Sequence, residues 1–169
     1  LDETLNGLPA VMLVGPRASG KTTTARRHAI TVVRLDRPVE AGPFRDDPDT
    51  VLAELDEPIL LDEWQMVPEV LAAVKRSIDD HGGANRFVLT GSVRAELLEA
   101  TWAATGRVIR LIRWGMTQRE VAGDVRADSV FDRLFAGEAE SLRSPSPAPG
   151  LPDYVDLALR GMFPELALQ

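Results

Sequence analysis

The sequence predicts an α/β fold in which a mainly parallel sheet of five strands lies between layers of helices. Five short apolar runs alternate along the chain with segments of helical spacing, which is the order of repeated β/α units. A glycine-rich turn joins the first apolar run to the first helical segment. With 169 residues, of which 44% are hydrophobic, the chain can bury a core of its own.

The elements follow in order from apolar runs, helical periodicity and Pro or Gly boundaries. Strands are expected at 11–14, 30–35, 59–61, 87–89 and 108–112. Helices are expected at 21–28, 50–55, 68–81, 95–102, 117–121, 129–135 and 154–159. Residues 37–48 are rich in Pro, Gly and Asp, and this composition predicts a loop.

The alternation weakens after Arg113, which gives the expected domain organisation. Residues 1–136 form the main domain, and residues 137–152, rich in Ser and Pro, form a mobile loop or linker. Residues 153–169 form a connecting helix that leads out of the domain. The chain begins at Leu1 rather than Met, which indicates a piece of a longer protein.

Composition excludes several classes of function. The net charge of −7 argues against a stand-alone nucleic-acid binder. The absence of cysteine excludes disulfides and thiolate metal sites and favours a cytoplasmic protein. No apolar run is long enough to span a membrane. The two histidines, His28 and His81, have no second ligand at a metal-binding spacing.

The strongest motif is a phosphate-binding loop between the first strand and the first helix. The expected nucleotide-binding residues are Gly15, Pro16, Arg17, Ala18, Ser19, Gly20, Lys21, Thr22 and Thr23. The two glycines let successive backbone amides point at a phosphate, and the helix N-terminus faces the same anion. Lys21 is expected to contact the β- and γ-phosphates, and the Thr22 hydroxyl to bind Mg²⁺. Lys21 carries extra weight because the chain has only one other lysine, Lys75.

Two carboxylates follow the strand expected at 59–61. Asp62 is the expected second ligand of the Mg²⁺ shell, and Glu63 is expected to polarise the attacking water. The adjacent glutamate favours an ATPase over GTPase-like and kinase-like proteins. No N-K-x-D motif for guanine is present, so ATP is the expected nucleotide.

The strand at 87–89 ends in Thr90, Gly91 and Ser92. Thr90 and Ser92 are candidate sensors that hydrogen-bond the γ-phosphate or the attacking water. The alternative is an ordinary strand-to-helix turn in which Ser92 caps the following helix.

Together these motifs resemble the prokaryotic AAA-type P-loop ATPases whose ATPase domain (AAA_14) precedes a C-terminal DUF4143 domain. The resemblance rests on the phosphate loop, on 61–69, on 89–92, on 106–108 and on 153–165. It implies a three-layer P-loop NTPase fold of the branch with an added strand (ASCE), with sheet order 5-1-4-3-2. It also implies a C-terminal domain after residue 169. The chain departs from the family pattern at Ala18, at 114–117 and at Met162.

Several residues keep two interpretations. Arg107 is either a γ-phosphate contact supplied to a neighbouring subunit of a homo-oligomer or a surface arginine at a strand edge. Arg17 lies in the loop and faces either solvent or a partner. Trp64 is typical of a packing residue, whereas Gln65 is placed to connect the site with a partner.

Three functions remain open on the sequence. The leading one is an Mg²⁺-dependent ATPase whose hydrolysis drives or times a conformational change in an attached domain or partner. The second is a nucleotide-binding switch with little hydrolysis of its own, and the third is a P-loop kinase.

Overall fold

The computed structural model describes residues 1–92, 107–123, 129–138, 140 and 148–168. The chain divides into two compact units, residues 1–114 and 115–169, and each is described by itself. The helix expected at 95–102 lies outside the described residues.

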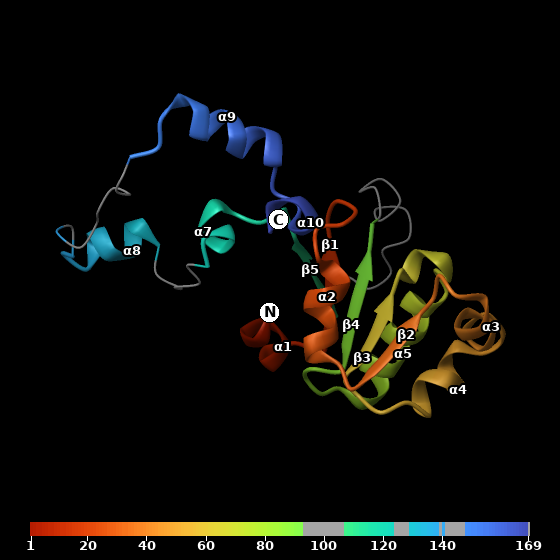
Figure 1. Ribbon diagram of the computed structural model, residues 1–169. Helices are drawn as coiled ribbons and strands as arrows, with labels where there is room; N and C mark the ends of the chain where they lie inside the picture. The colour runs from red at the N-terminus through yellow and green to blue at the C-terminus, as the bar shows by residue number, and fades with distance from the viewer. Residues whose placement is uncertain (93–106, 124–128, 139, 141–147, 169) are drawn as a thin grey trace. The chain divides into compact units, whose positions relative to one another are not determined.

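The first unit contains a five-stranded, fully parallel sheet (Figure 1). Its strands are β1 (Ala10–Val14), β2 (Thr31–Arg34), β3 (Ile59–Asp62), β4 (Phe87–Gly91) and β5 (Val108–Ile112). The order β2-β3-β4-β1-β5 is the expected order read from the other edge, which confirms the predicted fold class. β4 therefore lies between the strand that enters the phosphate loop and the strand that delivers the two carboxylates.

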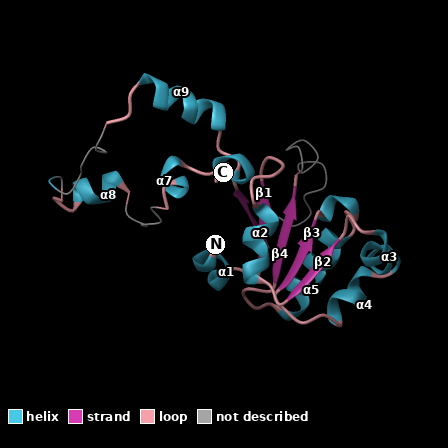
Figure 2. Ribbon diagram, in the orientation of Figure 1, coloured by secondary structure: helices cyan, strands magenta, loops and turns pink. Residues whose placement is uncertain are grey.

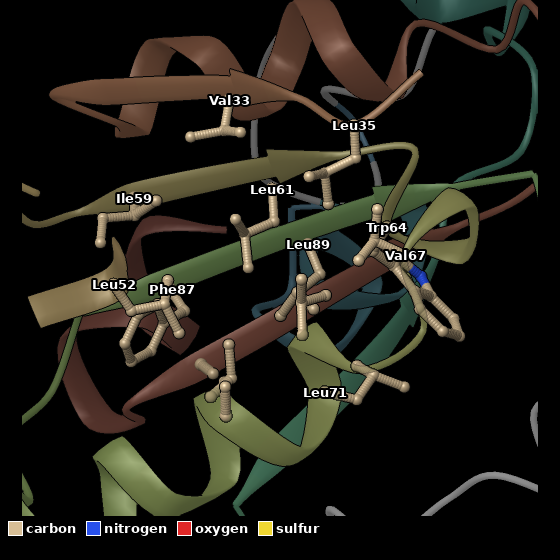
Figure 3. Close-up of a cluster of buried hydrophobic side chains, with 14 of the residues drawn as sticks. Val33, Leu35, Leu52, Ile59, Leu61, Trp64, Val67, Leu71, Phe87 and Leu89 are labelled. Carbon is tan, nitrogen blue, oxygen red and sulfur yellow. The ribbon is translucent and has the colours of Figure 1, made fainter. Parts of the chain in front are cut away.

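Helices cover both faces of this sheet (Figure 2). Alternate residues of the central strands point to opposite faces, and they pack there in two separate cores. The helical elements are α1 (Asp2–Gly7), α2 (Lys21–Ala25), η1 (Arg26–His28), α3 (Pro38–Asp46), α4 (Pro48–Ala53), η2 (Trp64–Met66) and α5 (Val70–His81). On one face, α3, α4 and α5 contribute residues to the larger core (Figure 3). On the other, Leu5 of α1 and Ala25 of α2 pack with Val11 and Val88.

The loop prediction for residues 37–48 is wrong, because most of this segment is helix α3. Pro38 stands in the first turn, where a missing amide donor costs nothing. Ala41 and Phe44 are buried in the larger core. Burial of that apolar pair outweighs the turn-forming composition of the segment.

Helix starts also differ from the prediction. α4 begins two residues early, at Pro48, because the Asp47 carboxylate accepts a hydrogen bond from the Thr50 amide at 3.1 Å. α5 begins at Val70 rather than Pro68. Helix α1, a single short segment before β1, was not predicted from the sequence.

The second unit contains four short helices within its described residues. They are α7 (Gln118–Val121), α8 (Val130–Phe135), α9 (Leu151–Arg160) and α10 (Pro164–Ala167). Thr117 and Ser129 cap the starts of α7 and α8 with reciprocal capping boxes. Both helices lie where the sequence predicted them, at 117–121 and 129–135. α9 starts inside the segment that the sequence assigned to a linker. Among the described residues of the chain, no helix is both long and apolar enough to cross a membrane.

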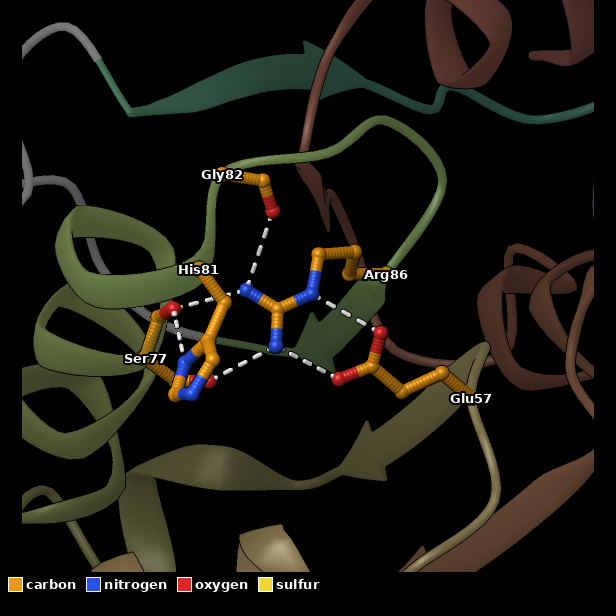
Figure 4. A network of polar contacts seen from close by, with 5 residues as sticks. All are labelled: Glu57, Ser77, His81, Gly82 and Arg86. Atoms are coloured by element: carbon orange, nitrogen blue, oxygen red, sulfur yellow. Dashed lines mark hydrogen bonds and ion pairs between the residues drawn. The ribbon is translucent and has the colours of Figure 1, made fainter.

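Arg86 organises the amino-terminal edge of the sheet, away from the phosphate loop (Figure 4). Its guanidinium forms a two-pronged ion pair with Glu57, at 2.8 and 2.6 Å. It also donates to the Ser77 carbonyl at 2.7 Å and to the Gly82 carbonyl at 3.1 Å, and it stacks over Phe87. Its side chain is only 11% exposed. One side chain thus joins the start of β4 to α5 and to the loop before β3.

We expect Arg86→Met to lower the free energy of unfolding by roughly 3 kcal/mol, because it leaves the Glu57 carboxylate and two carbonyls without their donor. The matched control is Arg76→Met, which removes an ion pair with Asp49 that is about half exposed, 53% and 48%. Urea unfolding of the two variants measures the difference. Equal stabilities would show that the Arg86 network contributes no more than a surface pair.

Candidate functional site

The phosphate loop joins β1 to α2 in a conformation that only particular residues allow. Gly20 has the left-handed φ of 84°, and Gly15 has φ of 153°. A Cβ on Gly15 would lie 2.0 Å from the carbonyl oxygen of Arg113, so no other residue fits there. Ala18 also has a positive φ, of 62°, at a position where the motif allows any residue.

Lys21 lies folded against the loop itself. Its ammonium donates to the carbonyl oxygens of Gly15 at 3.0 Å and Pro16 at 2.6 Å, and the residue is 6% exposed. Burial lowers the pKa of Lys21, and the negative charges of Glu63 and Asp62 partly offset that decrease. The lysine of the predicted phosphate-binding motif is therefore close enough to both carboxylates to interact with their charge.

Thr22, Asp62 and Thr90 meet at one carboxylate oxygen. The Thr22 hydroxyl donates to Asp62 Oδ1 at 2.8 Å, and the Thr90 hydroxyl donates to the same oxygen. Asp62 and Thr90 are both buried and are paired residues of β3 and β4. The structure thus joins the two predicted Mg²⁺ ligands and one predicted sensor, which come from three separate segments of the sequence.

Glu63 follows β3 in a left-handed conformation, with φ of 54° and ψ of 45°. This is a strained geometry for a residue with a Cβ, and such strain is concentrated at functional sites. Its carboxylate accepts a hydrogen bond from the side-chain amide of Gln65. Trp64, between them, is buried in the larger core, as the packing interpretation predicts.

The remaining predicted site residues are more exposed. Pro16, Arg17, Ala18, Thr23 and Ser92 all lie at the surface. Arg107 stands before β5, at the opposite end of the sheet from the phosphate loop, since Val108 pairs with Ala10 at the start of β1. Its guanidinium forms an ion pair with Asp79 at 2.7 Å. The structure does not bring Arg107 to the phosphate loop of its own chain.

Arg113 is a site residue that sequence reasoning missed. Its amide donates to the Val14 carbonyl at 2.7 Å, and its side chain donates to the Ser19 carbonyl at 2.9 Å. Arg113 thereby holds the phosphate loop from the end of β5. No local signal marks it, because the contact spans 94 positions and depends on β5 pairing with β1.

The residues of the phosphate loop and the end of β3 fit a nucleoside triphosphate with Mg²⁺. Ser19 lies in the loop, and its hydroxyl is buried without a hydrogen-bond partner in the described ranges of the chain. The Thr22 hydroxyl and the Asp62 carboxylate supply the oxygen donors that Mg²⁺ prefers. Within the described residues, no group of three or more His, Cys, Asp or Glu is placed to hold a metal, and Mg²⁺ bound with phosphates needs only one or two protein ligands.

Comparison with known proteins identifies the family of the chain. The model of the AAA domain family (AAA_14) matches residues 8–122. Two proteins named as uncharacterized, Mb2031c of Mycobacterium bovis and Rv2008c of Mycobacterium tuberculosis, are each 31% identical to this chain over 140 residues. Each alignment covers 80% of this chain and 30% of the relative, so the chain spans less than a third of these relatives. With a family match over more than half of its length and the fold and phosphate loop described above, the chain belongs to the AAA domain family.

Proposed function

We propose that the chain binds ATP with Mg²⁺ and hydrolyses it, and that hydrolysis drives or times a conformational change in an attached domain or partner. The observation that carries this proposal is the convergence of Lys21, Thr22, Asp62 and Glu63 at the carboxyl edge of the sheet. Ligands of open parallel sheets bind at this edge.

Each residue then has a role that follows from its chemistry. Lys21 balances the charge of the β- and γ-phosphates, and Thr22 with Asp62 holds the Mg²⁺ shell. Bound Mg²⁺ supplies electrostatic stabilisation of the phosphates. Glu63 accepts the proton of the attacking water, and Thr90 orients Asp62 through their shared hydrogen bond.

A nucleotide-binding switch with little hydrolysis is the second candidate. Glu63 beside Asp62 favours this switch over a kinase, and the position of Arg107 at the far end of the sheet, in its own ion pair, favours slow hydrolysis. A chain that lacks an arginine at the γ-phosphate hydrolyses slowly until a neighbour supplies one.

The partners follow from the same proposal. We infer a cytoplasmic protein that uses ATP. Its proposed partners are further copies of the chain, in a homo-oligomer, and a C-terminal domain. The relatives extend well beyond the matched 140 residues, so they have room for a further domain. We retain residues 1–136 as the ATPase domain, 137–152 as a linker and 153–169 as the connecting helix of that arrangement.

We expect Lys21→Ala to weaken ATP–Mg²⁺ binding at least tenfold, which is about 1.4 kcal/mol or more, because it removes the cation held at the phosphates. Isothermal titration calorimetry measures the affinity. Lys75→Ala on α5, the only other lysine, is the matched control and keeps wild-type affinity. Unchanged binding in a folded Lys21→Ala variant would contradict the site.

Glu63→Gln keeps the shape of the side chain but removes its proton acceptor. We expect ATP to bind with near wild-type affinity while turnover falls roughly 100-fold or more. Glu69→Gln, on an exposed glutamate six positions away, is the control and leaves turnover unchanged. Phosphate release measures turnover, and a wild-type rate in Glu63→Gln would remove Glu63 from the mechanism.

If Arg107 of a neighbouring subunit completes the site, turnover per chain rises with protein concentration. Mixing Lys21→Ala chains with Arg107→Ala chains should restore activity that neither variant has alone, because one composite site regains both groups. Asp79→Ala is the control: it breaks the Arg107 ion pair, keeps the arginine and retains activity. If sedimentation shows association and the mixture stays inactive, Arg107 is a surface arginine.

A further inference from the structure

Gln65 lies between Glu63, the base of the proposed reaction, and Gly91 at the end of β4. Its side-chain amide donates to Glu63 Oε2. Its other end, Oε1, is buried and has no hydrogen-bond partner among the residues that the structure describes. A Cβ built on Gly91 would lie 2.4 Å from this oxygen, so the amide oxygen rests directly against the last residue of β4.

The orientation of this amide follows from charge. An amide presents donors on one side and an acceptor on the other. The opposite orientation would place Oε1 against the Glu63 carboxylate, where two acceptors repel. The donor side therefore faces Glu63, and the acceptor faces Gly91.

The contact matches what a carboxylate base requires. One oxygen of Glu63 is occupied by a neutral donor, so the negative charge is kept, whereas a lysine or arginine in that place would neutralise it. Within the described part of the chain, the second oxygen has no hydrogen-bond partner and is therefore available for water. The amide also fixes the rotation of a carboxylate whose backbone is already held in the left-handed region.

Neighbouring residues fix Gln65 in turn. Trp64 is 2% exposed and anchors the turn η2 in the larger core. Its indole nitrogen, also buried without a partner, would lie 3.1 Å from a Cβ on Gly91. Glycine at position 91 leaves the space that the Gln65 amide and the Trp64 ring occupy.

We propose that Gln65 is the positioning residue of Glu63: it orients the carboxylate for attack on ATP by water, and Gly91 is required because any side chain there displaces the amide. This inference rests on the proposed ATPase function. It goes beyond the phosphate loop and the two carboxylates because it assigns the rate of the chemical step to a residue that touches neither nucleotide nor metal.

The first test detects the contact without any turnover. The side-chain amide signals of Gln65 in an ¹H–¹⁵N spectrum of the 169-residue chain are assigned by their loss in Gln65→Met. We expect these signals to move in Glu63→Gln, which removes the charge that they face, and to stay in place in Glu69→Gln. Signals that ignore the change at Glu63 would overturn the proposal.

The second test separates positioning from structure. In Gln65→Met we expect kcat to fall at least tenfold while KM for ATP changes less than twofold. Gln118→Met, the same substitution at an exposed glutamine, leaves both constants unchanged. In a Glu63→Gln background, Gln65→Met should have little further effect on kcat, because the two residues act as one unit.

Gly91→Ala provides an independent variant that keeps Gln65 itself. The new methyl group meets chiefly the flexible end of the Gln65 side chain, so the amide moves, while the Trp64 ring at 3.1 Å needs to shift by only a few tenths of an ångström. We expect a fall in kcat similar to that of Gln65→Met, and no additional fall when the two changes are combined.

The outcomes distinguish this inference from the proposed function. If the wild type hydrolyses ATP and Gln65→Met hydrolyses it at the same rate or faster, the positioning role alone is overturned. A faster rate would mean that Gln65 limits the action of Glu63. Absence of turnover in the wild type at every protein concentration removes the hydrolysis, and the role of Gln65 with it.

Discussion

The convergence of two threonine hydroxyls on one oxygen of Asp62 is the interaction on which the site depends. It joins the phosphate loop, β3 and β4, because Thr22 and Thr90 both donate to Oδ1. The parallel register makes this possible, since Asp62 pairs with Thr90 and Val14 pairs with Gly91. Carboxyl ends of neighbouring parallel strands lie at one edge, so residues that are far apart in the sequence come within hydrogen-bond distance there.

The two cores hold that edge in place. Residues of β1, β3 and β4 alternate between the larger core and the smaller one, so the central strands are buried on both faces. A shift of one residue in any of them would move its side chains to the wrong core. The register that aligns Asp62 with Thr90 is therefore enforced by apolar packing along the whole strand, and the polar contacts at its end need not supply that energy.

The two ends of the sheet have different tasks. At the amino end, the donors of Arg86 are taken up by Glu57, Ser77 and Gly82, which fixes the loops between helices and strands. At the carboxyl end, the Ser19 hydroxyl, the Trp64 indole and the Gln65 amide oxygen are buried without hydrogen-bond partners among the described residues, and at the amino end the Asn85 side-chain oxygen, beside Arg86, is buried in the same way. Unsatisfied buried groups cost free energy, and a fold retains them where a ligand or a catalytic geometry requires them.

The sequence by itself determined the strands, the phosphate loop and the two carboxylates, because glycine spacing and apolar runs act over a few neighbouring residues, whereas the strand order was implied by the resemblance to the AAA-type family. It predicted a loop at 37–48 that is helical, since burial of Phe44 against the sheet has no local signal. It named Gln65 without its contact, and it missed Arg113. Only the tertiary structure decided these contacts. The hydrogen bond from Arg113 to Ser19 and the close approach of Gly91 to Gln65 both depend on strands that pair across long stretches of chain.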